Sequence, residues 1–95
     1  MQYLAISRRR TDRYTDAEFA PHIAAERQRV RELYKEEILR AIWVRKDVPG
    51  AVMLLECDDE QRARAAFASL PLAQRDMLEV QIFPLAGYPA FFPIE

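Results

Sequence analysis

The spacing of hydrophobic positions divides the chain into strand-like and helix-like segments. Apolar residues alternate with polar ones, or form a short apolar run, in residues 2–8, 38–46, 51–57 and 77–83. Between residues 8 and 38, and again between residues 57 and 77, apolar residues recur three and four positions apart, as on one face of a helix. The sequence therefore predicts the order strand, helix, strand, strand, helix, strand, which is the split βαβ arrangement.

The first predicted helix has a recognisable start. Thr15 and Glu18 stand at the spacing of a capping box, in which each side chain satisfies a backbone N–H of the first turn. Pro21 follows and removes a backbone donor, so either residues 15–20 form a separate turn or the helix bends there. The helix is expected to end at residues 34–36. Its apolar stripe consists of Phe19, Ile23, Val30 and Leu33.

The second and third predicted strands are joined by a turn. Val48-Pro49-Gly50 favours a tight turn, because proline presets one central residue and glycine tolerates a positive φ at the next. The third strand is almost continuously apolar, which indicates that both of its faces are covered. Strict alternation in the second strand places Leu39, Ala41, Trp43 and Arg45 on one face and Arg40, Ile42, Val44 and Lys46 on the other.

The second helix and the C-terminal segment have their own signals. Asp58 or Asp59 is expected to cap the helix, and Leu70-Pro71-Leu72 is expected to end it. Its predicted buried face consists of Ala63, Ala66, Phe67 and Leu70. After the fourth strand, residues 84–95 are rich in proline and aromatic residues and have little scope for regular structure. We expect residues 85–95 to form an extended arm whose aromatic residues are Tyr88, Phe91 and Phe92.

This order of elements predicts one α+β domain of the ferredoxin-like kind over residues 1–95, with a four-stranded antiparallel sheet. Two helices can cover only one face of such a sheet. The other face and the aromatic arm then need a partner surface. A chain of 95 residues also has a small core for its surface area. We therefore expect a homodimer or a larger ring.

Composition and charge exclude several classes of function. The formal net charge is -1, so the chain as a whole has no strong attraction for nucleic acid or for an anionic membrane. No apolar stretch reaches the length of a membrane span, and the N-terminus lacks the pattern of a signal peptide. Cys57 is the single cysteine, which fits a reducing compartment. We expect a cytoplasmic protein that uses no metal or other cofactor.

The basic run Arg8-Arg9-Arg10 is the local exception to this charge balance. Such runs are usually solvated loop residues, and that is the expected reading here, with a clamp for a phosphate or a carboxylate as the alternative.

Glu26 is the chemically unusual position of the first helix. It occupies a place where the apolar stripe calls for a hydrophobic residue, so its carboxylate is expected to point toward the sheet. His22 lies one turn earlier and can contact it. The two could form a proton-transfer pair in a partly dry pocket. The alternative is that Glu26 forms a structural ion pair with Arg45 or Arg40.

Four further residues complete the candidate site. Arg27 and Arg45 are candidate ligand-binding cations, and Trp43 and Tyr34 are candidate stacking residues. For the two aromatic residues a place in the core is the commoner role, because large aromatic side chains dominate the cores of small domains.

Several motifs resemble the muconolactone isomerase family. They are Ala24-Ala25-Glu26-Arg27, then Leu33, Glu36, Arg40 and Trp43, and finally Leu70-Pro71-Leu72 followed by Glu79-Val80. The resemblance implies a dimeric α+β barrel, in which two four-stranded sheets face each other, with decamers possible. It also implies a cofactor-free 1,3 shift of a double bond in an unsaturated lactone. Glu26 matches a family acid, Arg27 replaces a lysine, and Val48 stands where the isomerases have a histidine.

Three classes of function follow. The first is a cofactor-free enzyme that shifts a double bond in a small unsaturated lactone or enol, with Glu26 as base and His22, Arg27 or Arg45 as polariser. The second is a non-catalytic homodimer that binds a small ligand or serves as an accessory protein. The third is a cofactor-free oxygenase of the same barrel type, because one fold hosts several chemistries.

Overall fold

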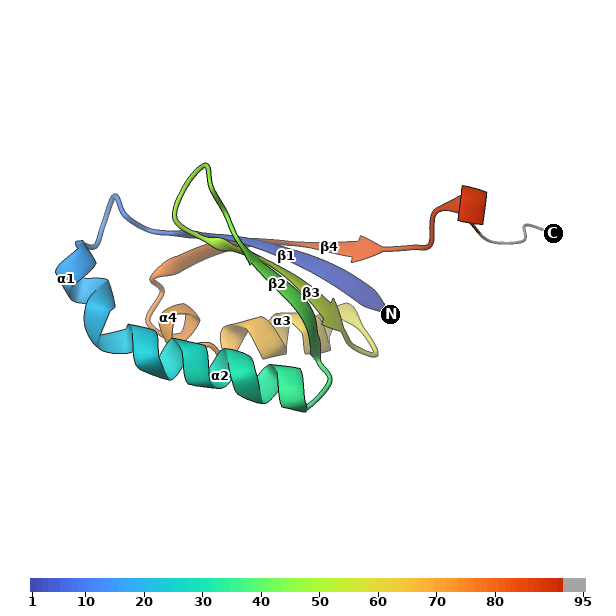
Figure 1. Cartoon of the computed structure of the whole chain (residues 1–95), viewed down its shortest axis with the longest axis horizontal. Coiled ribbons are helices and arrows are strands. Elements are labelled where there is room, and N and C mark those ends of the chain that lie inside the picture. Colours follow the sequence, from blue (N-terminus) through green and yellow to red (C-terminus); the bar gives the residue numbers. More distant parts are fainter. Residues whose placement is uncertain (92–95) are drawn as a thin grey trace.

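The computed structural model describes residues 1–91, which form a four-stranded sheet with helices on one side (Figure 1). The strand order is β2-β3-β1-β4, and every neighbouring pair is antiparallel. The strands are β1 (Gln2–Arg9), β2 (Leu39–Val44), β3 (Ala51–Glu56) and β4 (Leu78–Leu85). This arrangement confirms the predicted ferredoxin-like α+β fold.

The helical layer contains more pieces than the sequence pattern predicts. Its elements are α1 (Asp16–Phe19), η1 (Ala20–His22), α2 (Ile23–Lys35), α3 (Glu60–Ala68) and α4 (Pro71–Gln74). Pro21 separates α1 from α2 through a single 3-10 turn, so the predicted interruption is confirmed. The predicted capping box at Thr15 and Glu18 is present, and Asp59 caps α3. Pro71 does not simply stop a helix; it begins the short helix α4.

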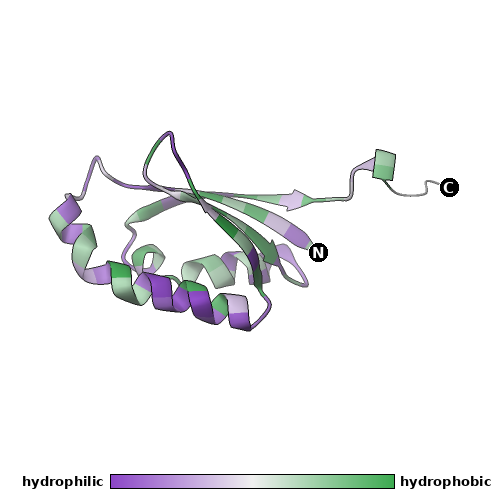
Figure 2. Ribbon diagram, in the orientation of Figure 1, coloured by the Kyte–Doolittle hydropathy of each residue, from purple (hydrophilic) through white to green (hydrophobic). Residues whose placement is uncertain are grey.

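The main core lies between the helices and one face of the sheet. On β1, Tyr3 and Ala5 point into it, and Ser7 continues this buried face. Leu33 of α2 and Leu55 of β3 are fully buried there. Figure 2 shows hydrophobic residues along the strands and many hydrophilic ones along α2, as expected of a helix that covers the sheet from outside.

A β-bulge in β2 corrects the predicted alternation. Leu39 pairs with Leu55, but Ala41 already pairs with the adjacent Leu54, so Arg40 is an extra residue. Leu39 is therefore buried on the helix side, and Ile42 shares that side, because the bulge shifts the alternation by one residue. The expectation that Leu39 shares a face with Ala41 and Trp43 was wrong.

The turn between β2 and β3 packs closely against the end of β1. The Arg9 N–H donates to the Pro49 carbonyl at 2.9 Å, and the Ser7 hydroxyl donates to the Ala51 carbonyl at 3.2 Å. A side chain on Gly50 would collide with the Ser7 carbonyl, so glycine is required here by close approach. Its φ is not in the left-handed region, contrary to the turn geometry expected from the sequence.

The outer face of the sheet is not covered by any described element (Figure 1). It carries Leu4, Ile6, Trp43, Val52, Leu54, Phe83 and Leu85. The near-continuous apolar character of β3 follows from this arrangement, since one of its faces meets the helices and the other joins this apolar surface.

The end of β4 extends further than predicted. The strand includes Pro84 and ends at Leu85, because β4 lies at the sheet edge, where a missing N–H is tolerated. The following segment leads away from the body and contains the short turn η2 (Pro89–Phe91). Tyr88 and Phe91 are exposed, with ring centroids 6.0 Å apart. Phe92, also expected in the arm, lies outside the described residues.

Candidate functional site

The main candidate pocket lies between α2 and the helix-facing side of the sheet, next to the β2–β3 turn. Its volume is about 470 Å³. Most of its wall is apolar, and its charged lining residues are Glu26, Arg9, Arg27 and Arg31. Its apolar walls include Val30, Ile42, Val44, Met53, Leu70, Leu72 and Leu78. This composition suits a small, largely apolar ligand with one or a few polar groups.

Glu26 is half-buried in the wall of this pocket, as its place in the apolar stripe of α2 predicts. Its Oε1 accepts a hydrogen bond from the backbone N–H of Leu72 at 3.0 Å. Burial raises the pKa of Glu26, and the Leu72 hydrogen bond and the charge of Arg9 oppose that rise only in part. The Leu72 hydrogen bond therefore orients the carboxyl group, and burial keeps its pKa above the ordinary value.

The Leu72 N–H is available because of the local sequence. Pro71 occupies the first turn of α4, where its missing N–H costs nothing, and Leu72 follows it with an N–H that has no intrahelical acceptor. The Leu72 side chain is buried with Phe19 and Met77, which fixes this peptide in place. The Leu-Pro-Leu sequence thus brings a backbone donor to a carboxylate that lies 46 positions away in the sequence.

Arg9 is a charged pocket residue that the site predicted around Glu26 does not include. The basic run Arg8-Arg9-Arg10 predicts a solvated loop, or alternatively an anion clamp, whereas the structure makes Arg9 the last residue of β1 and points it to the helix side. Tyr3, Ala5 and Ser7 occupy the same face of the strand. Extending the predicted strand by one residue would have placed Arg9 on this buried face.

Arg27 also lines the pocket, so the structure brings together two of the six predicted site residues, Glu26 and Arg27. Arg31 lies one turn further along α2 and lines the pocket as well. Both arginine side chains are largely exposed, and Arg31 donates to the Gln28 side chain at 3.0 Å.

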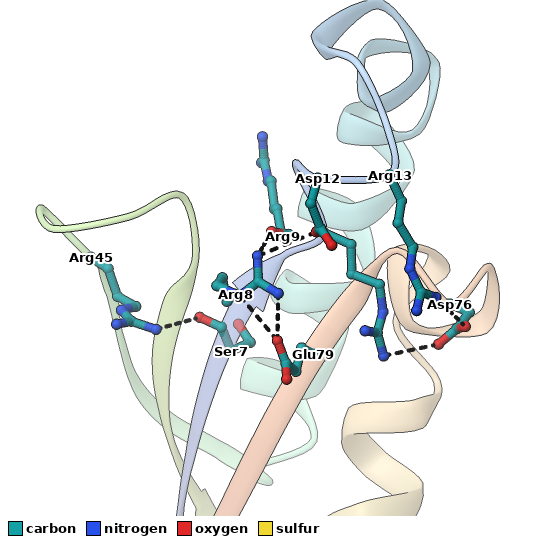
Figure 3. Close-up of polar contacts among 9 residues, drawn as sticks. Ser7, Arg8, Arg9, Asp12, Arg13, Arg45, Asp76 and Glu79 are labelled. Atoms are coloured by element: carbon teal, nitrogen blue, oxygen red, sulfur yellow. Dashed lines mark hydrogen bonds and ion pairs between the residues drawn. The ribbon is translucent and has the colours of Figure 1, made fainter.

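Arg45 lies outside this pocket, near the opposite side of the sheet. It donates to the Ser7 carbonyl at 3.3 Å (Figure 3). It also forms an ion pair with Asp47 at 2.7 Å. The Arg45 hydrogen bond, more than any other cause, lowers the pKa of Asp47 to about 2. Arg45 also lines a second, smaller pocket of about 260 Å³, together with Arg8 and Glu79.

The remaining three predicted residues do not meet Glu26. His22 lies in η1 and, within residues 1–91, makes no hydrogen bond to Glu26. Trp43 is 55% exposed on the outer face of the sheet, and Tyr34 is 65% exposed on α2. Neither aromatic residue lies in the core or in the pocket. Trp43 is exposed because the sheet face that carries it has no cover within the described chain.

The expected internal ion pair is also not formed. In the described part of the chain, Glu26 has no arginine or lysine nitrogen within 4.0 Å, so it pairs with neither Arg45 nor Arg40. The residues from 1 to 91 contain no group of three or more histidine, cysteine, aspartate or glutamate side chains that could hold a metal ion. Across the same residues, no helix has the length and apolar character needed to cross a membrane.

Solved structures of known proteins share this fold. Muconolactone isomerase has the same fold with a TM-score of 0.79 at 14% identity, covering 100% of this chain and 98% of the other. A 5-chloro-2-hydroxyhydroquinone dehydrochlorinase from Burkholderia phenoliruptrix AC1100, in complex with 2,5-dihydroxybenzoquinone, has a TM-score of 0.76 at 11% identity, covering 95% and 98%. No curated protein matches the sequence significantly.

At such low identities the two structures show the fold alone. The sequence itself carries the family pattern, because the family described as muconolactone delta-isomerase matches residues 1–90. The Glu26 and Leu-Pro-Leu elements that line the pocket lie within this match. From the sequence match and the fold together, the chain belongs to the muconolactone delta-isomerase family.

Proposed function

We propose that the chain is a cofactor-free enzyme that shifts a double bond in a small unsaturated lactone or enol, with Glu26 as the base. The observation that carries this proposal is the Glu26 carboxylate in the wall of a mostly apolar pocket, with a raised pKa and no ion-pair partner within residues 1–91. A carboxylate in that state can take a proton from carbon and give it back.

The proposed reaction is an internal proton transfer. Glu26 breaks a C–H bond next to the conjugated system and takes the proton, and the electron pair of that bond spreads onto the carbonyl oxygen as a dienolate. The same carboxyl group then returns the proton to a different carbon, so that the double bond moves and no atom is gained or lost. Because Oε1 is held by the Leu72 N–H, the other carboxylate oxygen is available for the proton.

The cationic part of the wall supports the same reaction. The dienolate carries a negative charge that the starting material lacks, and a nearby guanidinium group stabilises it more than it stabilises the substrate. We propose Arg27 as the polariser, because it lines the pocket next to the base in the sequence. His22 and Arg45, the other two candidates, lie outside the pocket.

We further propose that the chain works as a homodimer in the cytoplasm. The outer sheet face supports the dimer, because Trp43, Phe83 and Leu85 are exposed on it and no described element covers it. A second copy of the same sheet is the simplest cover of matching shape, and its contact would be isologous. The single cysteine, Cys57, carries a free thiol, which suits a reducing compartment.

The experiment compares Glu26→Gln with wild type in a hydrogen-exchange assay. Solvent deuterium incorporation is followed by NMR for a panel of unsaturated lactones and enols, to which a hydroxyhydroquinone is added because of the dehydrochlorinase fold relative. Glutamine keeps the shape of the side chain and can accept the Leu72 hydrogen bond. Exchange should fall by a factor of about 10² to 10⁴, the usual contribution of a positioned general base.

Glu32→Gln is the matched control. Glu32 lies on the same helix, six positions on, and its carboxylate pairs with Arg29 at 3.1 Å away from the pocket. This variant should exchange as fast as wild type. If wild type catalyses exchange on no compound, and Glu26→Gln melts at a lower temperature, the non-catalytic ligand-binding dimer becomes the better explanation.

A further inference from the structure

Arg9 differs from the other arginines at this end of the sheet. Arg8 and Arg9 are neighbours in β1, and their side chains point to opposite faces (Figure 3). Within residues 1–91, no carboxylate oxygen lies within 4.0 Å of the Arg9 guanidinium group. The other arginines of this region form ion pairs, which are Arg8 with Glu79, Arg10 and Arg13 with Asp76, and Arg45 with Asp47.

Arg9 is nevertheless held in place. Its backbone N–H donates a hydrogen bond to the Pro49 carbonyl, and Arg9 pairs with Leu78 of the neighbouring strand β4. Its guanidinium carbon lies 5.4 Å from the ring centroid of Phe19, which is a cation–π distance. Phe19 is buried, so the core holds the ring that contacts the guanidinium group. The cation is therefore oriented before any ligand arrives.

The charge of the pocket is not balanced by its own residues. Three arginines and one glutamate line it, and the rest of its wall is almost wholly apolar. Arg27 and Arg31 are largely exposed, whereas Arg9 is half-buried. A charge that is partly removed from water interacts more strongly with an anion than an exposed charge does. Arg9 is therefore the arginine best placed to discriminate among ligands.

We propose that Arg9 is the specificity-determining residue of this pocket and binds an anionic oxygen of the ligand, a carboxylate or an enolate. The ligand is then a small, flat, mostly apolar molecule with its negative group at Arg9 and a C–H bond toward Glu26. This inference rests on the proposed function insofar as it takes the pocket around Glu26 as the ligand site, but it does not require that the ligand react there.

The test is a binding measurement with three probes of similar shape. They are coumarin-3-carboxylate, the enolate of 4-hydroxycoumarin and neutral coumarin. Titrations are followed by amide NMR shifts at low salt for wild type, Arg9→Gln and Arg8→Gln. Arg8 is the matched control, since it is adjacent in sequence and lies on the opposite face with Glu79 as its partner.

Wild type and Arg8→Gln should bind at least one anionic probe about 10 to 100 times more tightly than coumarin, the range expected of hydrogen bonds to a charged group. The anion that binds more tightly shows whether the negative group of the ligand is a carboxylate or an enolate. In Arg9→Gln the ratio should approach one, and Arg9→Lys should recover part of it. The proposal is overturned if wild type shows no preference for either anion, or if Arg9→Gln keeps the preference of Arg8→Gln.

Binding and turnover separate this inference from the proposed function. If the anion preference depends on Arg9 while Glu26→Gln exchanges protons as fast as wild type, the assignment of Glu26 as the base is wrong and the role of Arg9 is supported. If exchange depends on Glu26 while the anion preference survives Arg9→Gln, the assignment of Glu26 as the base is supported and the proposed role of Arg9 is overturned.

Discussion

The Oε1 atom of Glu26 accepts a hydrogen bond of 3.0 Å from the backbone N–H of Leu72, and this contact joins α2 to the first turn of α4. It satisfies a donor that the short helix cannot satisfy itself, and it orients the proposed base. The same bond therefore serves the packing of two helices and, in the proposed function, the orientation of the base.

Glu26→Ala should remove this hydrogen bond and destabilise the folded chain. Without an acceptor, the partly buried Leu72 N–H loses its partner, at a cost of about 1–3 kcal/mol. The Leu72 amide should then exchange with deuterium faster than in wild type, whereas Glu26→Gln should leave it protected. The Met77 amide, which donates to the Leu72 carbonyl at 2.9 Å, is the internal control and should stay protected in both variants. Equal Leu72 protection in Glu26→Ala and wild type would contradict the prediction.

The raised pKa of Glu26 predicts a pH dependence of stability. Between the ordinary pKa of 4.5 and the higher pKa in the folded state, the folded chain binds more protons at this site than the unfolded chain. The contribution of Glu26 to the free energy of unfolding therefore falls as pH rises through that window, and the deficit persists above it.

Thermal melts of wild type and Glu26→Gln across this range measure the effect. The melting temperature of Glu26→Gln relative to wild type should increase as pH rises, because glutamine carries no charge. Exchange activity of wild type should increase over the same pH range, since the base must be ionised. A difference in melting temperature that stays constant with pH would show that folding does not shift this pKa.

Gly50→Ala should loosen the β2–β3 turn. The added methyl group would meet the Ser7 carbonyl of β1, and backbone cannot move aside as a flexible side chain can. Overpacking of this kind costs about 1–3 kcal/mol, and each kcal/mol lowers the melting temperature of so small a domain by about 4–8 °C. Gly87→Ala, in the exposed C-terminal segment, is the control and should melt like wild type. Equal melts for the two variants would refute the close contact.

The proposed dimer predicts different effects for two adjacent residues of β2. Trp43 lies on the outer face of the sheet, and Val44 lies on the opposite face at the pocket, where it is 83% exposed. Trp43→Glu should halve the mass measured by sedimentation at micromolar concentration, because it puts a charge into the apolar interface. Val44→Glu should leave the mass unchanged. A wild-type chain that sediments as a monomer would contradict the proposed dimer.

Much of the fold could be predicted from the sequence, because its signals are local. Thr15 and Glu18 are three residues apart and form their capping box whatever lies beyond the helix. The apolar stripe of α2 has the helical period, and Glu26 interrupts it, so a carboxylate turned toward the sheet was already indicated. The order of strands and helices then restricts the topology to very few arrangements.

Tertiary structure decided the neighbours of Glu26. Its partner, Leu72, is distant in sequence and offers a backbone N–H, a group that every residue except proline carries and that no sequence pattern marks. The bulge at Arg40 exchanged the faces of β2, because a single extra residue reverses a period of two. For the same reason Arg8 and Arg9, identical in type and adjacent in sequence, have different roles. One forms an ion pair on the outer face and the other enters the pocket, and only the last pairing of β1 determines which is which.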